Sequence, residues 1–254
     1  MNILQIDGLT VEVAGKRVLE DVNLEIPEGE VHVLFGPNGC GKTSLILSIL
    51  GFSNYRVVSG KILFNGVDVT NMPINERVKL GIGIAFQNPP VIRGVKLGDI
   101  LRSLIKGDTN SKRREHELAG AVNFPVDFLG RDLNMGFSGG EMKRSEILQV
   151  LAQKPKFVML DEPDSGVDIE NLELIGKVIN NFLEDRSGLL ITHLGYILRY
   201  VDVDKAHVLI DKTIACSGKP IEILNHILSE GYRWCEKCPA IRKRHYGLEV
   251  NPQP

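Results

Sequence analysis

The 254-residue sequence has no long hydrophobic run and almost no net charge. Its apolar stretches all fall short of the roughly 18 consecutive apolar residues that a membrane-spanning helix needs. The chain begins without the basic start and apolar stretch of a targeting segment, so we expect no direct membrane insertion. With 30 Lys and Arg against 32 Asp and Glu, the formal net charge is −2. This balance indicates no nucleic acid partner.

Cysteine is scarce as well. The four cysteines are too few to suggest a disulfide framework, so we expect reduced thiols and a cytoplasmic location. Cys235 and Cys238 form a single C-x2-C pair, which supplies only half of a tetrahedral metal site. Structural thiols, a zinc or Fe–S site and a redox pair are the three alternatives for it. Neither an internal repeat nor a low-complexity tract interrupts the chain.

A glycine-rich loop of the form G-x4-G-K-T extends from Gly36 to Thr43. It lies between an apolar run suited to a buried strand, 31–35, and a run that can form a helix, 44–50. In this context the backbone N–H groups can close around phosphate oxygens, and the helix dipole adds positive potential. We therefore predict a nucleotide phosphate site, rather than a structural turn, at Gly36, Pro37, Asn38, Gly39, Cys40, Gly41, Lys42, Thr43 and Ser44.

Three side chains of this loop have distinct expected roles. Lys42 reaches the β- and γ-phosphates, and the Thr43 hydroxyl ligates Mg²⁺. Cys40 is expected to point away from the phosphates as a small apolar side chain. In the empty site, the helix N-terminus could instead make its thiol reactive.

Two further patterns lie about a hundred residues later. Residues 137–141 read Phe-Ser-Gly-Gly-Glu and precede a stretch, 142–153, that is compatible with a helix. An apolar run then predicts a buried strand that ends in Asp161 and Glu162. Paired acids at such a strand end are the usual position of a Mg²⁺-orienting aspartate and a catalytic glutamate.

The order of these motifs resembles the ATP-binding cassette (ABC) family, with Gln87, Asp168 and His193 at the remaining motif positions. The resemblance implies that Asp161 and Gln87 approach Mg²⁺ and that Glu162 polarises the attacking water. It implies that His193 contacts the γ-phosphate and that Asp168 belongs to a loop near the nucleotide. Taken alone, the acid pair would be read as a solvated strand end and the histidine as a core residue.

The resemblance also implies the fold. We expect an α/β ABC ATPase cassette with a P-loop (RecA-like) mixed or parallel sheet core, an N-terminal antiparallel β subdomain and an inserted helical lobe. Hairpins are predicted at Ala14-Gly15 and Asn65-Gly66, and helices over 97–105 and 111–122. Within a single domain, 1–254, the ATP-binding lobe is predicted at 1–87 and 143–254 and the helical lobe at 88–142.

In this family the signature loop completes the nucleotide site of the opposite cassette. The resemblance thus assigns Ser138, Gly139, Gly140 and Glu141 to ATP bound by a second copy. Because the chain has one set of motifs, an ATP-dependent homodimer is expected. Many members stack an aromatic side chain on adenine where this sequence has Val13. Plain apolar contact there should weaken adenine binding by about 1 kcal/mol.

Between the motifs, the sequence resembles the Suf-system ATPase of iron–sulfur cluster assembly, in segments 54–60, 85–95, 137–149, 164–168 and 230–234. The resemblance implies Suf-type Fe–S scaffold subunits as partners. The alternative is the ATP-binding subunit of a membrane ABC transporter; a nucleic-acid-linked ATPase fits less well because those usually fuse two cassettes. Val91 and Ile92 are expected to contact the partner, unless they fill the core between the lobes.

Overall fold

The structure is a computed structural model that describes residues 1–105, 110–193 and 195–232. The chain divides into two compact units, residues 1–77 with the chain from residue 203 onward, and residues 78–202. The predicted lobes, 1–87 with 143–254 and 88–142, divide the chain differently and stay a prediction. The C-x2-C pair of Cys235 and Cys238 lies outside the described residues.

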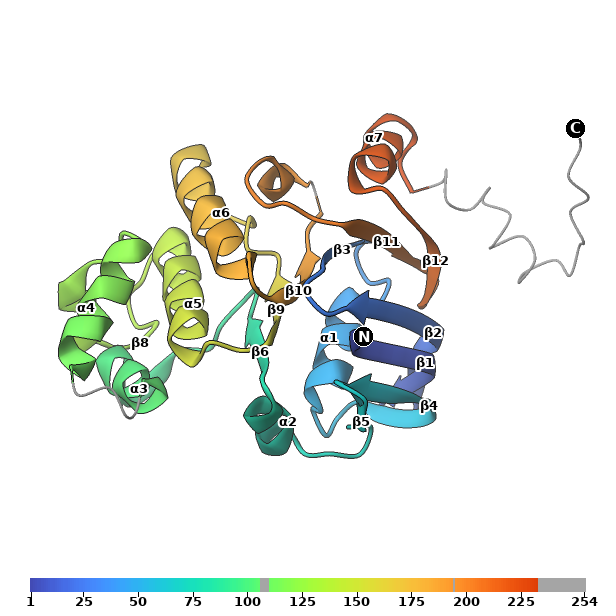
Figure 1. Cartoon of the computed structure of the whole chain (residues 1–254), viewed down its shortest axis with the longest axis horizontal. Coiled ribbons are helices and arrows are strands. Elements are labelled where there is room, and N and C mark those ends of the chain that lie inside the picture. Colours follow the sequence, from blue (N-terminus) through green and yellow to red (C-terminus); the bar gives the residue numbers. More distant parts are fainter. Residues whose placement is uncertain (106–109, 194, 233–254) are drawn as a thin grey trace, which may run out of the picture. The chain divides into compact units, whose positions relative to one another are not determined.

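An antiparallel sheet of order β2-β1-β4-β5 forms one part of the first unit (Figure 1). Its strands are β1 (Asn2–Val13), β2 (Lys16–Pro27), β4 (Arg56–Phe64) and β5 (Val67–Asp68). Ala14 and Gly15 both have positive φ, as do Asn65 and Gly66. Such turns match the twist of two antiparallel strands, so both predicted hairpins are confirmed.

The other strands of this unit flank the predicted phosphate loop, which begins directly after β3. Strand β3 (Val31–Phe35) is buried at all five positions and pairs in parallel with β11 (Lys205–Ile210), which pairs antiparallel with β12 (Thr213–Gly218). Helix α1 (Lys42–Leu50) follows the loop and contacts β2 and β4. Helix α7 (Pro220–Glu230) contacts β11. Because β11 pairs in parallel with β3 and antiparallel with β12, these strands form a mixed sheet.

The second unit holds three parallel strands in the order β10-β9-β6. These are β6 (Ile82–Ala85), β9 (Phe157–Asp161) and β10 (Ser187–Ile191), and every residue of β9 and β10 is buried. Continuous apolar runs are typical of parallel strands covered on both faces. Because β9 and β10 pair in parallel with Ile191 opposite Asp161, the two strands end side by side.

Most helices of the second unit lie to one side of these strands, with α3 and α4 beyond α5 (Figure 1). They are α3 (Leu97–Leu104), α4 (Ser111–Ala121), α5 (Gly139–Gln153) and α6 (Ile169–Leu183), with 3₁₀ turns η1 (Val126–Gly130) and η2 (Tyr196–Arg199). Helix α5 contacts α3, α4, α6 and strand β6. The predicted helices over 97–105 and 111–122 are confirmed within one residue at each end.

Three details differ from the sequence-based expectation. Helix α5 begins at Gly139 rather than at residue 142, so the glycines of the signature form its first turn. The segment predicted to be helical also contains a two-stranded ladder of β7 (Ile92–Lys96) and β8 (Asp132–Leu133). Strands β11 and β12 and helix α7 had no sequence-based prediction, because no chemical motif marks them. Helix α2 (Ile74–Leu80) is short and spans the boundary of the two units.

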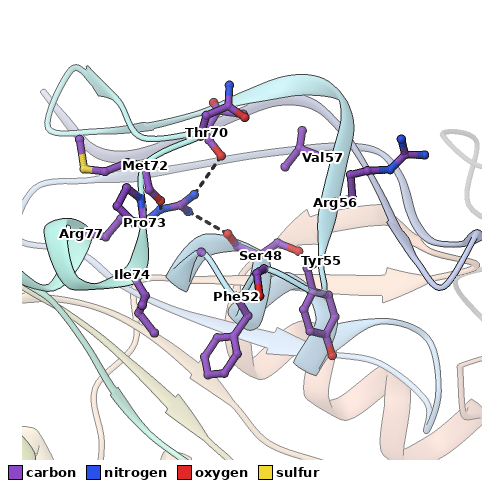
Figure 2. Close-up of a pocket in the computed structure, with 13 residues that line it drawn as sticks. Ser48, Phe52, Tyr55, Arg56, Val57, Thr70, Met72, Pro73, Ile74 and Arg77 are labelled. Carbon is purple, nitrogen blue, oxygen red and sulfur yellow. Dashed lines mark hydrogen bonds between the residues drawn. The ribbon is translucent and has the colours of Figure 1, made fainter.

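A pocket of about 470 Å³ lies at the C-terminal end of α1 (Figure 2). Buried Arg77 donates hydrogen bonds there to four backbone oxygens, those of Ser48, Ile49, Thr70 and Met72. Burial lowers the pKa of this guanidinium to about 10. A cation that satisfies the last carbonyl groups of a helix also complements its dipole, so Arg77 anchors the helix that follows the phosphate loop.

Candidate nucleotide site

The predicted phosphate loop has the tight backbone that its glycines allow. A Cβ at Gly36 would lie 2.4 Å from the Leu209 oxygen, and one at Gly41, whose φ is 115°, would lie 2.8 Å from the Val18 oxygen. Side chains at these two positions would force the loop away from β11 and β2. Close packing therefore requires glycine at both positions, and at Gly41 the positive φ requires it as well.

Lys42 lies inside the loop that it belongs to. Its ammonium group donates to the oxygens of Gly36 and Pro37, at 2.8 and 3.0 Å, and its side chain is buried. Asn38 and Gly39 form the exposed tip of the loop. The lysine is thus held at the centre of the loop, where incoming phosphate oxygens can replace the two carbonyl groups.

The start of α1 fits a phosphate group. Its N-cap is Gly41, no side chain caps its first N–H groups, and no acidic residue lies in its first turn. The first four N–H groups of a helix have no partner within the helix, so these donors suit anionic oxygens. Thr43 is exposed and Ser44 partly exposed in the same turn. Lys42 and the loop N–H groups would bind the phosphates of ATP. The Thr43 hydroxyl would supply one ligand of Mg²⁺.

Cys40 is buried at 7% exposure. Burial raises the pKa of its thiol, even though Lys42 partly opposes the effect. A thiol held in its protonated form is a poor nucleophile. The expectation of a small side chain pointing into the protein therefore agrees with the structure, and the alternative of a reactive thiol does not.

In the second unit, Asp161 is the last residue of β9 and Glu162 follows it directly. Asp161 is buried, and Glu162 has a left-handed backbone with φ 48°. The Glu162 N–H donates to the oxygen of Ile191 at the end of β10, 3.0 Å away. Because non-glycine residues avoid this conformation, a packed turn must hold Glu162 in it, as is frequent at functional sites.

The structure brings the three predicted catalytic residues together. Gln87 donates from its side-chain amide to one carboxylate oxygen of Glu162, at 2.5 Å. The ring nitrogen Nε2 of His193 lies 2.7 Å from the other oxygen. Glu162 is nearly buried, whereas His193 is partly exposed. A carboxylate held by an amide and an imidazole is positioned as a proton acceptor requires.

Lys143 is a functional candidate that the sequence did not reveal. It projects from α5, is buried, and donates to the backbone oxygens of Gln87 and Glu162 at 2.9 and 2.8 Å. Burial lowers its pKa, while nearby acids, Asp161 first among them, act in the opposite direction. Its only sequence signal was its place in the turn after the signature glycines. One ammonium group thus joins the Gln87 segment to the turn at Glu162.

Neighbouring polar groups extend this cluster. Glu146, three residues after Lys143, accepts from the N–H of Phe86, and burial raises the pKa of its carboxyl group. The Thr192 hydroxyl donates to Asp164 at 2.6 Å and accepts from the N–H of Gly195. These contacts position the segments on both sides of His193 and Glu162.

The signature residues form the start of α5. The Ser138 hydroxyl accepts from the N–H of Glu141, and the Glu141 carboxylate accepts from the N–H of Ser138 at 2.7 Å. This reciprocal capping box leaves Gly139 exposed at the positive end of the helix. A Cβ at Gly139 would lie 3.6 Å from the oxygen of Gly166, so the signature adjoins the loop that contains Asp168.

Asp168 has a structural role at the start of helix α6. It is the N-cap of α6, where its carboxylate accepts from the N–H and the side chain of Asn171. These hydrogen bonds lower the pKa of Asp168. Its predicted contribution to nucleotide binding, like that of half-buried Val13 at the end of β1, stays a prediction.

Similarity to known proteins shows the family of this chain. A family model described as "ABC transporter" matches residues 19–165. Vegetative protein 296 of Bacillus subtilis is 39% identical, over 97% of this chain and 98% of that protein. The chain is an ABC-family ATPase. It uses ATP and Mg²⁺, and the predicted cassette fold is confirmed.

Other similarities of this ABC ATPase agree. A "Probable ABC transporter ATP-binding protein" of Streptococcus pyogenes is 37% identical over 91% of the chain and 94% of that protein. A "Probable ATP-dependent transporter" of Cyanidium caldarium is 38% identical over 93% and 97%. A nucleotide-free ATP-binding cassette from an ABC transporter superposes with a TM-score of 0.74 at 26% identity, over 91% and 96%. Among the described helices, none is both long and apolar enough to cross a membrane.

Proposed function

We propose that this ABC ATPase hydrolyses ATP with Glu162 as the base for the attacking water and His193 and Gln87 as its neighbours. Asp161, Thr43 and Gln87 hold Mg²⁺, and Lys42 with the loop from Gly36 to Ser44 binds the phosphates. The observation that carries this proposal is the cluster in which Gln87 and His193 contact the two oxygens of one buried carboxylate. Hydrogen-bond partners of this kind orient a base for water activation.

The complete site is proposed to need two copies of the chain. Ser138, Gly139, Gly140 and Glu141 sit at an exposed helix start and would contact the γ-phosphate held by the other copy. A dimeric post-hydrolysis cassette bound to ADP and Pi has the same fold, with a TM-score of 0.74 at 22% identity. We infer that ATP closes a symmetric homodimer of this chain.

For the partner, the first candidate is a cytoplasmic Fe–S scaffold of the Suf type. Its support is the sequence itself, because the Suf-like segments lie between the motifs that all cassettes share. One of them, 85–95, includes Gln87 and continues into the exposed strand β7. ATP binding would then drive a conformational change in the scaffold through this segment.

The second candidate is the ATP-binding subunit of a membrane transporter. The Streptococcus relative is named as a probable ABC transporter ATP-binding protein and the Cyanidium relative as a probable ATP-dependent transporter, which favours this candidate over the Suf scaffold. In that case the same exposed segment would bind a separate membrane-spanning subunit.

One purification separates the two candidates. The tagged chain is expressed at native level and recovered without oxygen from soluble and detergent-solubilised membrane fractions, with and without Mg-ATP. A stoichiometric soluble partner that contains iron and raises the ATPase rate supports the Suf scaffold. A stoichiometric multi-spanning membrane protein supports the transporter and overturns the first candidate. Normal ATPase activity of Glu162→Gln would overturn the catalytic assignment independently of the partner.

A further inference from the structure

The tyrosine that follows helix α7 lies against the first residue of the phosphate loop. Helix α7 ends at Glu230, and Gly231, with φ 66°, redirects the chain. The hydroxyl oxygen of Tyr232 accepts a hydrogen bond from the N–H of Gly36, with an N···O distance of 3.2 Å. The fold thereby brings a residue from the C-terminal part of the first unit to the nucleotide site.

Gly36 is also fixed on its other sides. A Cβ there would lie 2.4 Å from the Leu209 oxygen and 2.7 Å from the sulfur of Cys40, so the backbone packs directly on β11. The Gly36 oxygen accepts the hydrogen bond from Lys42. This one residue therefore connects a buried strand, the phosphate-binding lysine and the hydroxyl of Tyr232.

Tyr232 is presented by an anchored element. Ile223 and Ile227 are buried on one face of α7, and the helix contacts β11, the strand on which Gly36 packs. Both partners of the Tyr232–Gly36 hydrogen bond are thus positioned by the same strand. A contact between two groups fixed in this way restrains the loop with little further loss of conformational freedom.

Binding of a phosphate changes the contacts of Gly36. The ammonium group of Lys42 must exchange the oxygens of Gly36 and Pro37 for phosphate oxygens. After that exchange, Gly36 is still held by β11 and by the hydroxyl of Tyr232. A loop that keeps its conformation while the lysine moves binds its ligand without a new ordering cost.

We propose that Tyr232 is a positioning residue for ATP binding, whose hydroxyl holds Gly36 and the adjoining loop in the conformation that receives the phosphates. The proposal rests on the assignment of residues 36–44 as the phosphate-binding loop. Tyr232 lies outside the cassette motifs and contacts the loop rather than the nucleotide. Its loss should therefore affect binding, while the chemistry at Glu162 proceeds once ATP is bound.

Tyr232→Phe tests the proposal because it keeps the ring and removes only the hydroxyl. We expect the Kd values for Mg-ATP and Mg-ADP to rise by about threefold to tenfold, the effect of one lost hydrogen bond. The two nucleotides should change by the same factor, because both place a β-phosphate in the loop. The kcat at saturating ATP should stay within about twofold of the wild type. Equilibrium titration with fluorescent nucleotides and steady-state ATPase assays give these quantities.

Two further variants make each outcome decisive. Tyr55→Phe removes a tyrosine hydroxyl near the opposite end of α1 and should leave nucleotide affinity unchanged. Lys42→Ala tests the loop assignment by itself: wild-type affinity in that variant overturns the assignment. If Lys42→Ala binds weakly but Tyr232→Phe binds like the wild type, the proposed role of Tyr232 is wrong. A lower melting temperature of Tyr232→Phe with unchanged Kd values likewise reduces Tyr232 to a structural residue.

Discussion

Lys143 donates a hydrogen bond from its ammonium group to the backbone oxygen of Glu162, at 2.8 Å. The same group reaches the backbone oxygen of Gln87, so one side chain holds both segments that supply the proposed water-activating groups. The left-handed backbone of Glu162 is intrinsically unfavourable by about 1–2 kcal/mol. The contact with Lys143 helps to stabilise that conformation against relaxation.

We expect Lys143→Met to lower stability and ATPase activity together. The change keeps the length of the side chain but removes the Lys143 donor from the Gln87 oxygen and leaves the Glu162 oxygen with the N–H of Ser165, which costs about 2–3 kcal/mol. For a chain of this size the melting temperature should fall by about 5–10 °C. Calorimetry checks the result against Lys177→Met, an exposed lysine in a surface ion pair with Glu173, which should change little. An unaltered melting temperature for Lys143→Met would show that these contacts add nothing to stability.

Lys42→Ala and Glu162→Gln should fail in different ways. Loss of Lys42 removes a buried cation from the phosphate loop, so the Kd for Mg-ATP should rise at least about tenfold. Glu162→Gln keeps the shape of the side chain and should spare binding while kcat falls by about 10²–10⁴. ATP then accumulates in closed dimers, which sizing in Mg-ATP detects. A Glu162→Gln protein that stays monomeric with bound ATP would contradict the proposed two-copy site.

The strong local signals of the sequence predicted much of this fold. Continuous apolar runs ending in the phosphate loop or in Asp161 and Glu162 mark buried parallel strands, and the structure has them as β3 and β9. Strand β7 escaped prediction because all five of its residues are exposed and its pairing depends on β8, forty residues away. Local periodicity carries no information about such a distant partner.

Some contacts of the candidate site follow from sequence motifs, and others arise only from tertiary packing. Motif order predicted the grouping of Gln87, Glu162 and His193. The contacts of Lys143 were not predicted, because a lysine on a predicted helix is usually exposed to solvent. Only tertiary packing buries this side chain. Tyr232 meets Gly36 across 196 residues of sequence, a separation at which no local pattern operates.

Acidification should destabilise the chain through a buried histidine pair in the first unit. The ring of His207 contacts His32 at 2.9 Å, and burial lowers the pKa of His207 to about 3 and also lowers that of His32. His207 also contacts Ser217, and His32 contacts Glu30. Unfolded histidine binds a proton near pH 6.5, so stability is present above that pH and is lost as the pH falls toward 3.

The expected loss for His207 alone is about 2 kcal/mol between pH 7 and pH 5. Lys205 opposes protonation of both rings, whereas Glu30 and Asp204 favour protonation of His32, whose share is therefore smaller. Urea unfolding at several pH values measures the slope. His207→Met should flatten this slope, because it removes the buried imidazole whose pKa is lowered to about 3. Equal slopes in the wild type and His207→Met would contradict the assignment.

The exposed segment after Gln87 should decide partner binding. Val91 and Ile92 are 53% and 40% exposed, so they do not fill the core. Ile92 pairs with Leu133 through the backbone, and Gly94 donates to the Asp132 carboxylate, which holds the segment in place. Protein interfaces typically have an apolar centre and a polar rim. Val91 and Ile92 suit the centre of such an interface, and Arg93 and Lys96 suit its rim.

Ile92→Asp combined with Arg93→Glu should therefore leave the melting temperature and basal ATPase nearly unchanged, because only exposed side chains change. The same variant should lose co-purification with its partner, and the partner should no longer raise its ATPase rate. The matched control is Ile221→Asp with Lys219→Glu, an exposed apolar residue of α7 and the basic residue at its N-cap, which should retain the partner. Retention by the Ile92 variant would place the interface elsewhere, and a collapse of its melting temperature would show that β7 is needed for folding. Loss of a soluble iron-containing scaffold would tie β7 to Fe–S assembly, and loss of a membrane-spanning subunit would tie it to transport.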